Sequence, residues 1–105
     1  MIMDHKLKLM VVDDSPLFRT WLIHSLSADD RFQVVGYAVN ALDAQEKIPL
    51  LQPDMLTLDI EMPGMSGIDF LKQLLPVHPI PVILVSSLNL RVFDALEAGA
   101  VDFVR

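Results

Sequence analysis

The sequence contains no cysteine, which excludes disulfide bonds and thiolate chemistry but leaves the redox compartment undetermined. Its four glycines form neither a G-x-G-x-x-G nor a G-x-x-x-x-G-K pattern, so it has no phosphate-cradling loop of the nucleotide-binding kind. No apolar run approaches the ~18 residues of a membrane span, and the short N-terminal run lacks the cleavage site of a signal peptide. We therefore expect a cytoplasmic protein without membrane insertion.

Basic residues are also scarce. Eight Lys and Arg stand against fourteen Asp and Glu, which gives a formal charge of −6 and a pI near 4.7. Binding to a phosphate backbone needs a basic surface, so we expect no nucleic-acid partner. The three histidines are scattered without the spacing of metal ligands.

Hydrophobic residues, by contrast, are abundant. They make up 52% of the 105 residues, and the mean hydropathy is +0.44. One domain of this size with so many apolar residues indicates strands that are covered on both faces, as in a parallel sheet. The periodicity predicts strands at 6–12, 32–39, 55–58, 82–85 and 100–104, and helices at 15–28, 41–51, 67–75 and 90–98. In the first helix, Trp21 is expected in the core or at its edge.

Two of the predicted strands end in acidic residues. The run Leu7–Val12 precedes Asp13 and Asp14, and the run Met55–Leu58 precedes Asp59 and a loop rich in Pro and Gly. Parallel strands end at the same edge of a sheet, where ligands usually bind. Three carboxylates there would repel one another unless a cation relieved them, and Mg²⁺ suits such a set of oxygen ligands.

The same acids also allow plainer interpretations. An Asp before a Pro/Gly loop, such as Asp59, can simply start a turn. Asp13 and Asp14 can cap the next helix, because Asp favours N-caps and Ser15 is followed by Pro16 at a probable first helical position. Capping and metal binding are compatible, since one acid can cap while its neighbour binds the ion.

Several segments resemble the response-regulator receiver domain, and the resemblance covers essentially all 105 residues. The segments that carry it are Val11–Ser15, Leu58–Gly67 and Val82–Ser87. Within the receivers, three segments resemble the chemotaxis protein-glutamate methylesterases, namely Thr57–Pro63, Val85–Leu88 and Ala95–Val104. In that family an N-terminal receiver precedes a C-terminal hydrolase, so residues 1–105 are expected to be a receiver that lacks its output domain.

The resemblance implies an α/β fold. It is the flavodoxin-like, doubly wound parallel sheet of five strands in the order 2-1-3-4-5, with the final helix absent from this chain. A missing helix would leave part of one sheet face bare, which suggests a dimer or a domain swap. The segment between Ser86 and Gly99 also looks short for the family, by roughly one helical turn.

The resemblance also implies a role for each acid. Asp59 is expected to be the phosphoacceptor that takes phosphate from a sensor histidine kinase of the chemotaxis type. Asp14 and Asp59 would bind Mg²⁺ through their carboxylates, and Asp13 mainly through water. Glu61 would add its backbone carbonyl.

Three further positions belong to the implied switch. Ser86 matches the residue that hydrogen-bonds the phosphoryl group, and Phe103 matches the aromatic whose rotamer follows it. Their alternatives stay open: Ser86 as a turn residue at a strand end, and Phe103 as a core aromatic. The Lys that contacts the phosphoryl group in receivers would be residue 106, and Arg105 stands one place too early to replace it.

Three functions remain in view. The first is a phosphorylated receiver that controls a methylesterase-type output domain and is itself no enzyme on external substrates. The second is a Mg²⁺-dependent phosphohydrolase of the haloacid-dehalogenase type, which also has a nucleophilic Asp and a second acid two residues later, as Asp59 and Glu61 are. The third is a receiver-shaped scaffold that works without phosphorylation.

Overall fold

The computed structural model describes residues 6–85 and the backbone of residues 102–104. Within these residues strands and helices alternate along the chain. The elements are β1 (Leu7–Val12), α1 (Pro16–Ser27), β2 (Phe32–Ala38), α2 (Ala41–Leu51), β3 (Met55–Asp59), α3 (Gly67–Leu74), β4 (Val82–Val85) and β5 (Asp102–Val104). No helix among the described residues is long and apolar enough to cross a membrane.

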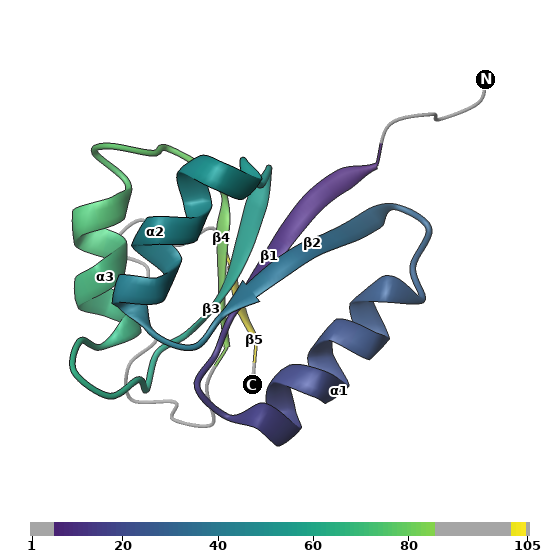
Figure 1. Ribbon diagram of the computed structural model, residues 1–105, viewed down its shortest axis with the longest axis horizontal. Coiled ribbons are helices and arrows are strands. Elements are labelled where there is room, and N and C mark those ends of the chain that lie inside the picture. Colours follow the sequence, from purple (N-terminus) through teal and green to yellow (C-terminus); the bar gives the residue numbers. More distant parts are fainter. Residues whose placement is uncertain (1–5, 86–101, 105) are drawn as a thin grey trace.

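The strands form one parallel sheet. Their order is β2-β1-β3-β4-β5, which confirms the predicted flavodoxin-like topology. All of their carboxyl ends lie at the lower edge of the sheet in Figure 1. Because β1 and β3 are neighbours, whatever follows these two strands is brought together at that edge.

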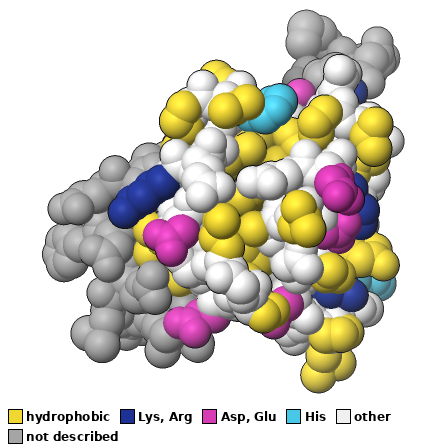
Figure 2. Space-filling view, turned by 60° about the vertical axis from the view of Figure 1, so that its left-hand side comes forward, with side chains coloured by type: hydrophobic (Ala, Val, Ile, Leu, Met, Phe, Trp, Pro, Cys, Tyr) yellow, Lys and Arg dark blue, Asp and Glu magenta, His cyan; other side chains and the backbone are white. Residues whose placement is uncertain are grey.

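The helices form two layers, with α2 and α3 on one face of the sheet and α1 on the other (Figure 1). The larger core lies under α2 and α3, where Ile48, Phe70 and Leu71 pack against Leu56 and Leu58 of β3. All five are at most 3% exposed, so this layer holds β3 and α3 firmly around the loop between them. Hydrophobic side chains also reach the surface between acidic ones on this face (Figure 2).

The expectation for Trp21 was wrong. Its side chain is 61% exposed, Leu17 is 85% exposed, and no residue of α1 is fully buried. A single helix, about 10 Å wide, covers two strands with one face and leaves its other face in solvent. Among the described residues α1 therefore carries exposed apolar surface, where the rings of Phe18 and Trp21 lie 5.6 Å apart.

On the sheet face that carries α1, the described side chains of β1, β3 and β4 are not bare. Leu9, Val11, Thr57 and Val85 are all less than 9% exposed, and Ile83 is half-buried. The bare patch expected from the sequence is thus missing from these strands.

Each of the described helices α1, α2 and α3 begins at the same edge of the sheet, and each has a capping side chain there. Ser15, Asn40 and Ser66 accept hydrogen bonds from the backbone N–H groups three residues further on. Pro16 occupies the first position of α1, where its missing N–H costs nothing. The capping residues thereby help to fix the loops that lead into these three helices.

The edge strand β2 contains a bulge. Leu9 of β1 pairs with Val34 of β2, but the next residue, Met10, pairs with Gly36, so Val35 is an extra residue in the ladder. Beyond the bulge the register is regular again and places Val11 opposite Tyr37.

Candidate functional site

Three carboxylates meet at the carboxyl edge of the sheet. Asp13 and Asp14 follow β1, and Asp59 ends β3, whose Leu58 pairs with Val12. One carboxylate oxygen from each of the three lies within 4.8 Å of the others. The cluster predicted from the two acidic strand ends is therefore present, and we call Asp13, Asp14 and Asp59 the acidic cluster.

Asp13 is the buried member, with an exposed fraction of 3%. Its N–H donates to the carbonyl of Ala38 at 3.0 Å, and its Oδ1 accepts from the N–H of Ser15 at 2.8 Å. The residue that caps α1 is Ser15 rather than Asp13 or Asp14. The expectation that Asp13 or Asp14 caps α1 was therefore wrong; Asp13 instead accepts a hydrogen bond within the turn before the helix, and its carboxylate stays in the cluster.

Asp59 is half-buried and is held by the loop that follows it. The N–H of Glu61 donates to Asp59 Oδ1 at 3.0 Å, which limits rotation of the carboxylate. The N–H of Gly67 donates to the carbonyl of Ile60 at 2.7 Å, so the start of α3 lies directly against the end of β3. These bonds fix both the backbone and the carboxylate of Asp59.

The electrostatics of the cluster follow from its crowding. The pKa of Asp59 is raised from its ordinary value of 3.8 to about 7, mainly by burial and also by the nearby Asp13 and Asp14, while the hydrogen bond from the Glu61 N–H opposes the rise. Burial also raises the pKa of Asp13, as does Asp14, while the Ser15 N–H and the charge of Arg19 lower it. The cluster is short of positive charge, which is the condition that a bound cation would relieve.

The pH dependence of the free energy of unfolding of the metal-free protein tests whether the three carboxylates are crowded. In the folded protein Asp59 keeps its proton to a higher pH than in the unfolded chain, so the folded state binds more protons between pH 4 and pH 7. The free energy of unfolding should therefore fall across this window, by about 1–2 kcal/mol once solvent screening is allowed for. Urea titrations in EDTA at several pH values measure it, and a free energy that rises or stays level would contradict the raised pKa.

The residues present fit a hard divalent cation. Three converging carboxylates, two of them with raised pKa values, form the kind of oxygen donor set that Mg²⁺ prefers. An open pocket of about 380 Å³ adjoins the cluster and is lined by Asp14, Ile60, Glu61, Met62, Pro63 and Ser66. A phosphate-bearing ligand would have room to approach Asp14 and the Glu61 side of the loop from there.

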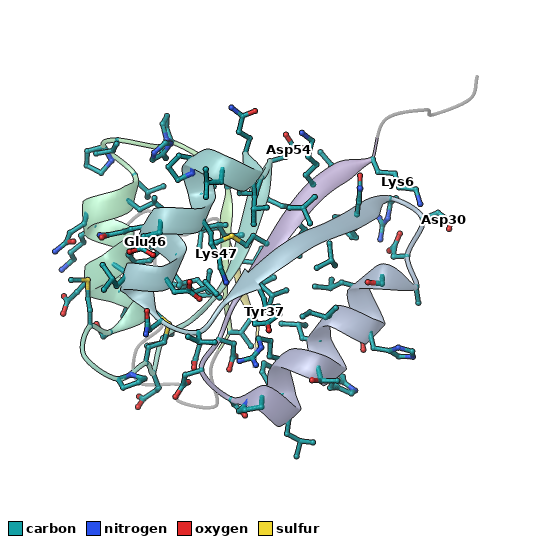
Figure 3. All side chains as sticks on the ribbon, viewed as in Figure 1. Lys6, Asp30, Tyr37, Glu46, Lys47 and Asp54 are labelled. Carbon is teal, nitrogen blue, oxygen red and sulfur yellow. The ribbon has the colours of Figure 1, made fainter. Side chains whose placement is uncertain are left out.

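Other acids lie elsewhere. Asp54 sits at the opposite edge of the sheet, at the amino end of β3 (Figure 3), where its Oδ2 accepts from the N–H of Lys8 at 2.8 Å. It ties β3 to β1 and takes no part in the acidic cluster. Ser86 and Arg105 lie outside the described residues, and so does the side chain of Phe103, whose backbone pairs with Leu84.

One residue at the site was not predicted from the sequence. Arg19 of α1 donates from Nη1 to the carbonyl oxygen of Asp13 at 3.0 Å. An arginine in the second turn of an amphipathic helix has the pattern of a solvated residue, so the spacing of the sequence contains no signal for this contact.

Comparison with known proteins identifies the family. Residues 9–105 match the response regulator receiver domain, and the chain belongs to this family. Among the receivers it is similar to those of protein-glutamate methylesterases. It is 50% identical over 99 residues to protein-glutamate methylesterase/protein-glutamine glutaminase 2 of Syntrophomonas wolfei, covering 94% of this chain and 29% of that protein. The Vibrio vulnificus protein of the same name is 47% identical, covering 97% of this chain and 31% of the relative.

Solved structures agree. The response regulator domain of Thermotoga maritima CheB has a TM-score of 0.88 and 41% identity, with 94% of this chain and 77% of that chain covered. CheY in a CheX–CheY complex with BeF3 and Mg²⁺ from Borrelia burgdorferi is among the similar structures as well, with a TM-score of 0.81, 29% identity, and coverage of 93% of this chain and 76% of that chain. The present chain spans about three tenths of the length of the curated relatives it matches.

Proposed function

We propose that Asp59 is the phosphoacceptor of a receiver in a chemotaxis-type response regulator. The observation that carries this proposal is the acidic cluster itself, with a half-buried carboxylate at the end of β3 and two more acids within 4.8 Å. A carboxylate is an established covalent nucleophile, and phosphoryl transfer depends mostly on positioning and neutralisation of charge.

Each residue then has a defined task. Asp59 attacks the phosphorus of a kinase phosphohistidine, so that a phosphorus–oxygen bond forms as the phosphorus–nitrogen bond breaks. The Glu61 N–H keeps the attacking carboxylate oriented. Asp14 and Asp59 would hold Mg²⁺ through their carboxylates, Asp13 would hold it mainly through water, and Glu61 would use its carbonyl. Bound there, the ion would supply the positive charge that the cluster and the incoming phosphoryl oxygens lack.

The output follows from the new charge. A phosphoryl group adds up to about two negative charges and strong acceptor oxygens at neutral pH. We assign Ser86 to hydrogen-bond these oxygens and Phe103 to change rotamer in response. In the full-length protein this change controls a C-terminal methylesterase-type domain, in keeping with the relatives that the chain matches, and the protein works in the cytoplasm with a sensor histidine kinase as its phosphodonor.

Intact mass measurement tests the proposal. Incubation with acetyl phosphate and Mg²⁺ should add a single phosphoryl group, EDTA should prevent the addition, and Asp59→Asn should take none. Asp69→Asn is the matched control, because it removes an exposed acid from the first turn of α3 and should be phosphorylated like the wild type.

Other outcomes point to the other functions. Release of phosphate over many cycles from unrelated phosphoesters would favour a phosphohydrolase of the haloacid-dehalogenase type. A wild type that takes no phosphoryl group, both as residues 1–105 and when extended beyond residue 106, would favour a scaffold.

A further inference from the structure

Arg19 connects α1 to the acidic cluster through two contacts. Its Nη1 donates to the carbonyl oxygen of Asp13 at 3.0 Å, and its guanidinium carbon lies 4.4 Å from the centre of the Tyr37 ring. The guanidinium is planar and can stack on an aromatic ring while its edge still donates hydrogen bonds. The guanidinium group of the half-buried Arg19 thus contacts Tyr37 with its face and the Asp13 carbonyl with its edge. The two contacts together fix its position more tightly than either contact alone.

Tyr37 is itself held from two sides. It pairs with Val11 in the sheet, next to the end of β1. Lys47 reaches from α2 over the edge of the sheet toward Tyr37 (Figure 3), donates to the Tyr37 carbonyl at 2.8 Å, and places its Nζ 5.1 Å from the ring centre. The same Nζ lies 3.1 Å from Asp43 Oδ2. The ring therefore lies near two cations, and its backbone is fastened to both β1 and α2.

The carbonyl that Arg19 holds belongs to the peptide bond between Asp13 and Asp14. The N–H of Asp13 donates to Ala38, and its carboxylate accepts from the N–H of Ser15. The hydrogen bond from Arg19 restrains the backbone carbonyl, which is the remaining polar group of Asp13. A peptide group is planar, and fixing its carbonyl fixes the direction in which the chain continues into Asp14. The Arg19 contact therefore restrains the backbone from which the side chains of both acids project.

We propose that Arg19, seated on Tyr37, is a positioning residue that holds Asp13 and Asp14 in the arrangement that binds a divalent cation. This role rests on the proposed function, in which the acidic cluster binds Mg²⁺. It assigns to Arg19 no contact with the phosphoryl group or with the ion.

The direction in which the Mg²⁺ affinity changes when Arg19 is removed distinguishes a positioning role from an effect of its charge. A positive group close to the cluster opposes binding of a second cation, so if Arg19 acted only through its charge, removing it would tighten Mg²⁺ binding. If Arg19 acts by position, removing it weakens binding, because outer partners that orient metal ligands are worth about 10–100-fold in affinity.

The first experiment is calorimetric titration with Mg²⁺ alone. Arg19→Met should raise the Kd about tenfold, and Arg19→Lys should recover only part of the loss, because an ammonium group has no planar face to lie on the Tyr37 ring. Arg31→Met is the matched control. Arg31 also lies near a ring, 5.5 Å from the centre of Phe32, but it is exposed and pairs with Asp29 in the α1–β2 turn, so its loss should leave the Kd unchanged. A Kd for Arg19→Met that is equal to or lower than the wild-type value would overturn the proposal.

A double-mutant cycle tests the contact of Arg19 with the Tyr37 ring. Tyr37→Phe keeps the ring and should bind Mg²⁺ like the wild type, whereas Tyr37→Leu should weaken binding nearly as much as Arg19→Met. In the Arg19→Met background Tyr37→Leu should have little further effect, since both changes break the same support. If the loss of Mg²⁺ affinity in the double variant equals the product of the two single losses, Tyr37 does not act through Arg19.

Hydrogen exchange measured in EDTA tests the role of Arg19 independently of the proposed function. Hydrogen exchange of the Asp13 amide should quicken several-fold in Arg19→Met relative to the Leu58 amide in the core, and Arg31→Met should show no such change. If the wild type binds no Mg²⁺, the proposed function fails, while the exchange measurement still decides whether Arg19 restrains the turn. Equal Asp13 exchange in wild type and Arg19→Met would mean that it does not.

Discussion

Replacing Gly67 with alanine is expected to destabilise the protein by about 2–3 kcal/mol and to slow phosphorylation of Asp59 by one to two orders of magnitude. A Cβ at this position would overlap the carbonyl oxygen of Asp59 and would lie 2.8 Å from the Cα of Ile60. Both neighbours are backbone atoms, so no side chain can turn aside. The end of β3 or the start of α3 has to move, and either movement displaces the carboxylate of Asp59, the proposed phosphoacceptor.

Gly64 is the matched control for this change. It lies in the same loop with a φ of +86°, and nothing stands within 4 Å of the place its Cβ would take. Gly64→Ala should therefore cost about 1 kcal/mol from backbone strain alone and leave the rate of phosphorylation close to the wild-type value. Urea denaturation and the initial rate with acetyl phosphate measure the two effects. If both glycine variants lose activity equally, the close approach at Gly67 does not control the site.

Asp59→Asn is expected to abolish phosphorylation and, at the same time, to stabilise the metal-free protein. Above the raised pKa of about 7, the wild type carries three crowded negative charges, and the variant carries one fewer in nearly the same volume. The gain in the free energy of unfolding should be about 1–2 kcal/mol at pH 8 and should vanish near pH 3, where Asp59 is largely protonated in both the folded and the unfolded state. Urea titrations in EDTA at the two pH values measure this gain.

Asp69→Asn shows whether the gain belongs to the cluster. It removes the same charge from an exposed position in the first turn of α3, where a negative charge is favourable near the helix N-terminus. This variant should lose about 0.3–1 kcal/mol rather than gain stability. A gain of equal size in both variants would mean that relief of the overall charge of −6, rather than of the local crowding, is responsible.

Such a pair of opposed effects is typical of functional sites, which keep groups that stability alone would remove. The acidic cluster was nevertheless predictable, because two buried parallel strands that end in acid leave their side chains no other place than the shared edge of the sheet. The strand order could likewise be predicted, through the family resemblance and the alternation of strands and helices. The notable failure in the described fold concerns Trp21, since helical spacing shows which residues share a stripe but not whether a second element covers that stripe.

The residues that hold the acidic cluster in place could not be predicted from the sequence. The contact of Arg19 with the Asp13 carbonyl joins residues on two elements, and its seat on Tyr37 brings in a third, so no periodicity reports them. The need for glycine at position 67 depends on how closely α3 approaches β3, which is set by the packing of Phe70 and Leu71 in the core. These features follow from tertiary geometry, whereas the acids themselves follow from local pattern.

The extra residue in β2 has a consequence for the behaviour of the protein in a crowded cell. An outer strand with a flat, regular row of backbone groups is a template on which another chain can add a strand and begin to aggregate. The offset at Val35 bends and twists β2 just where such an addition would have to continue. The bulge therefore disfavours the addition of a strand from a second copy to β2 and the growth of an extended sheet.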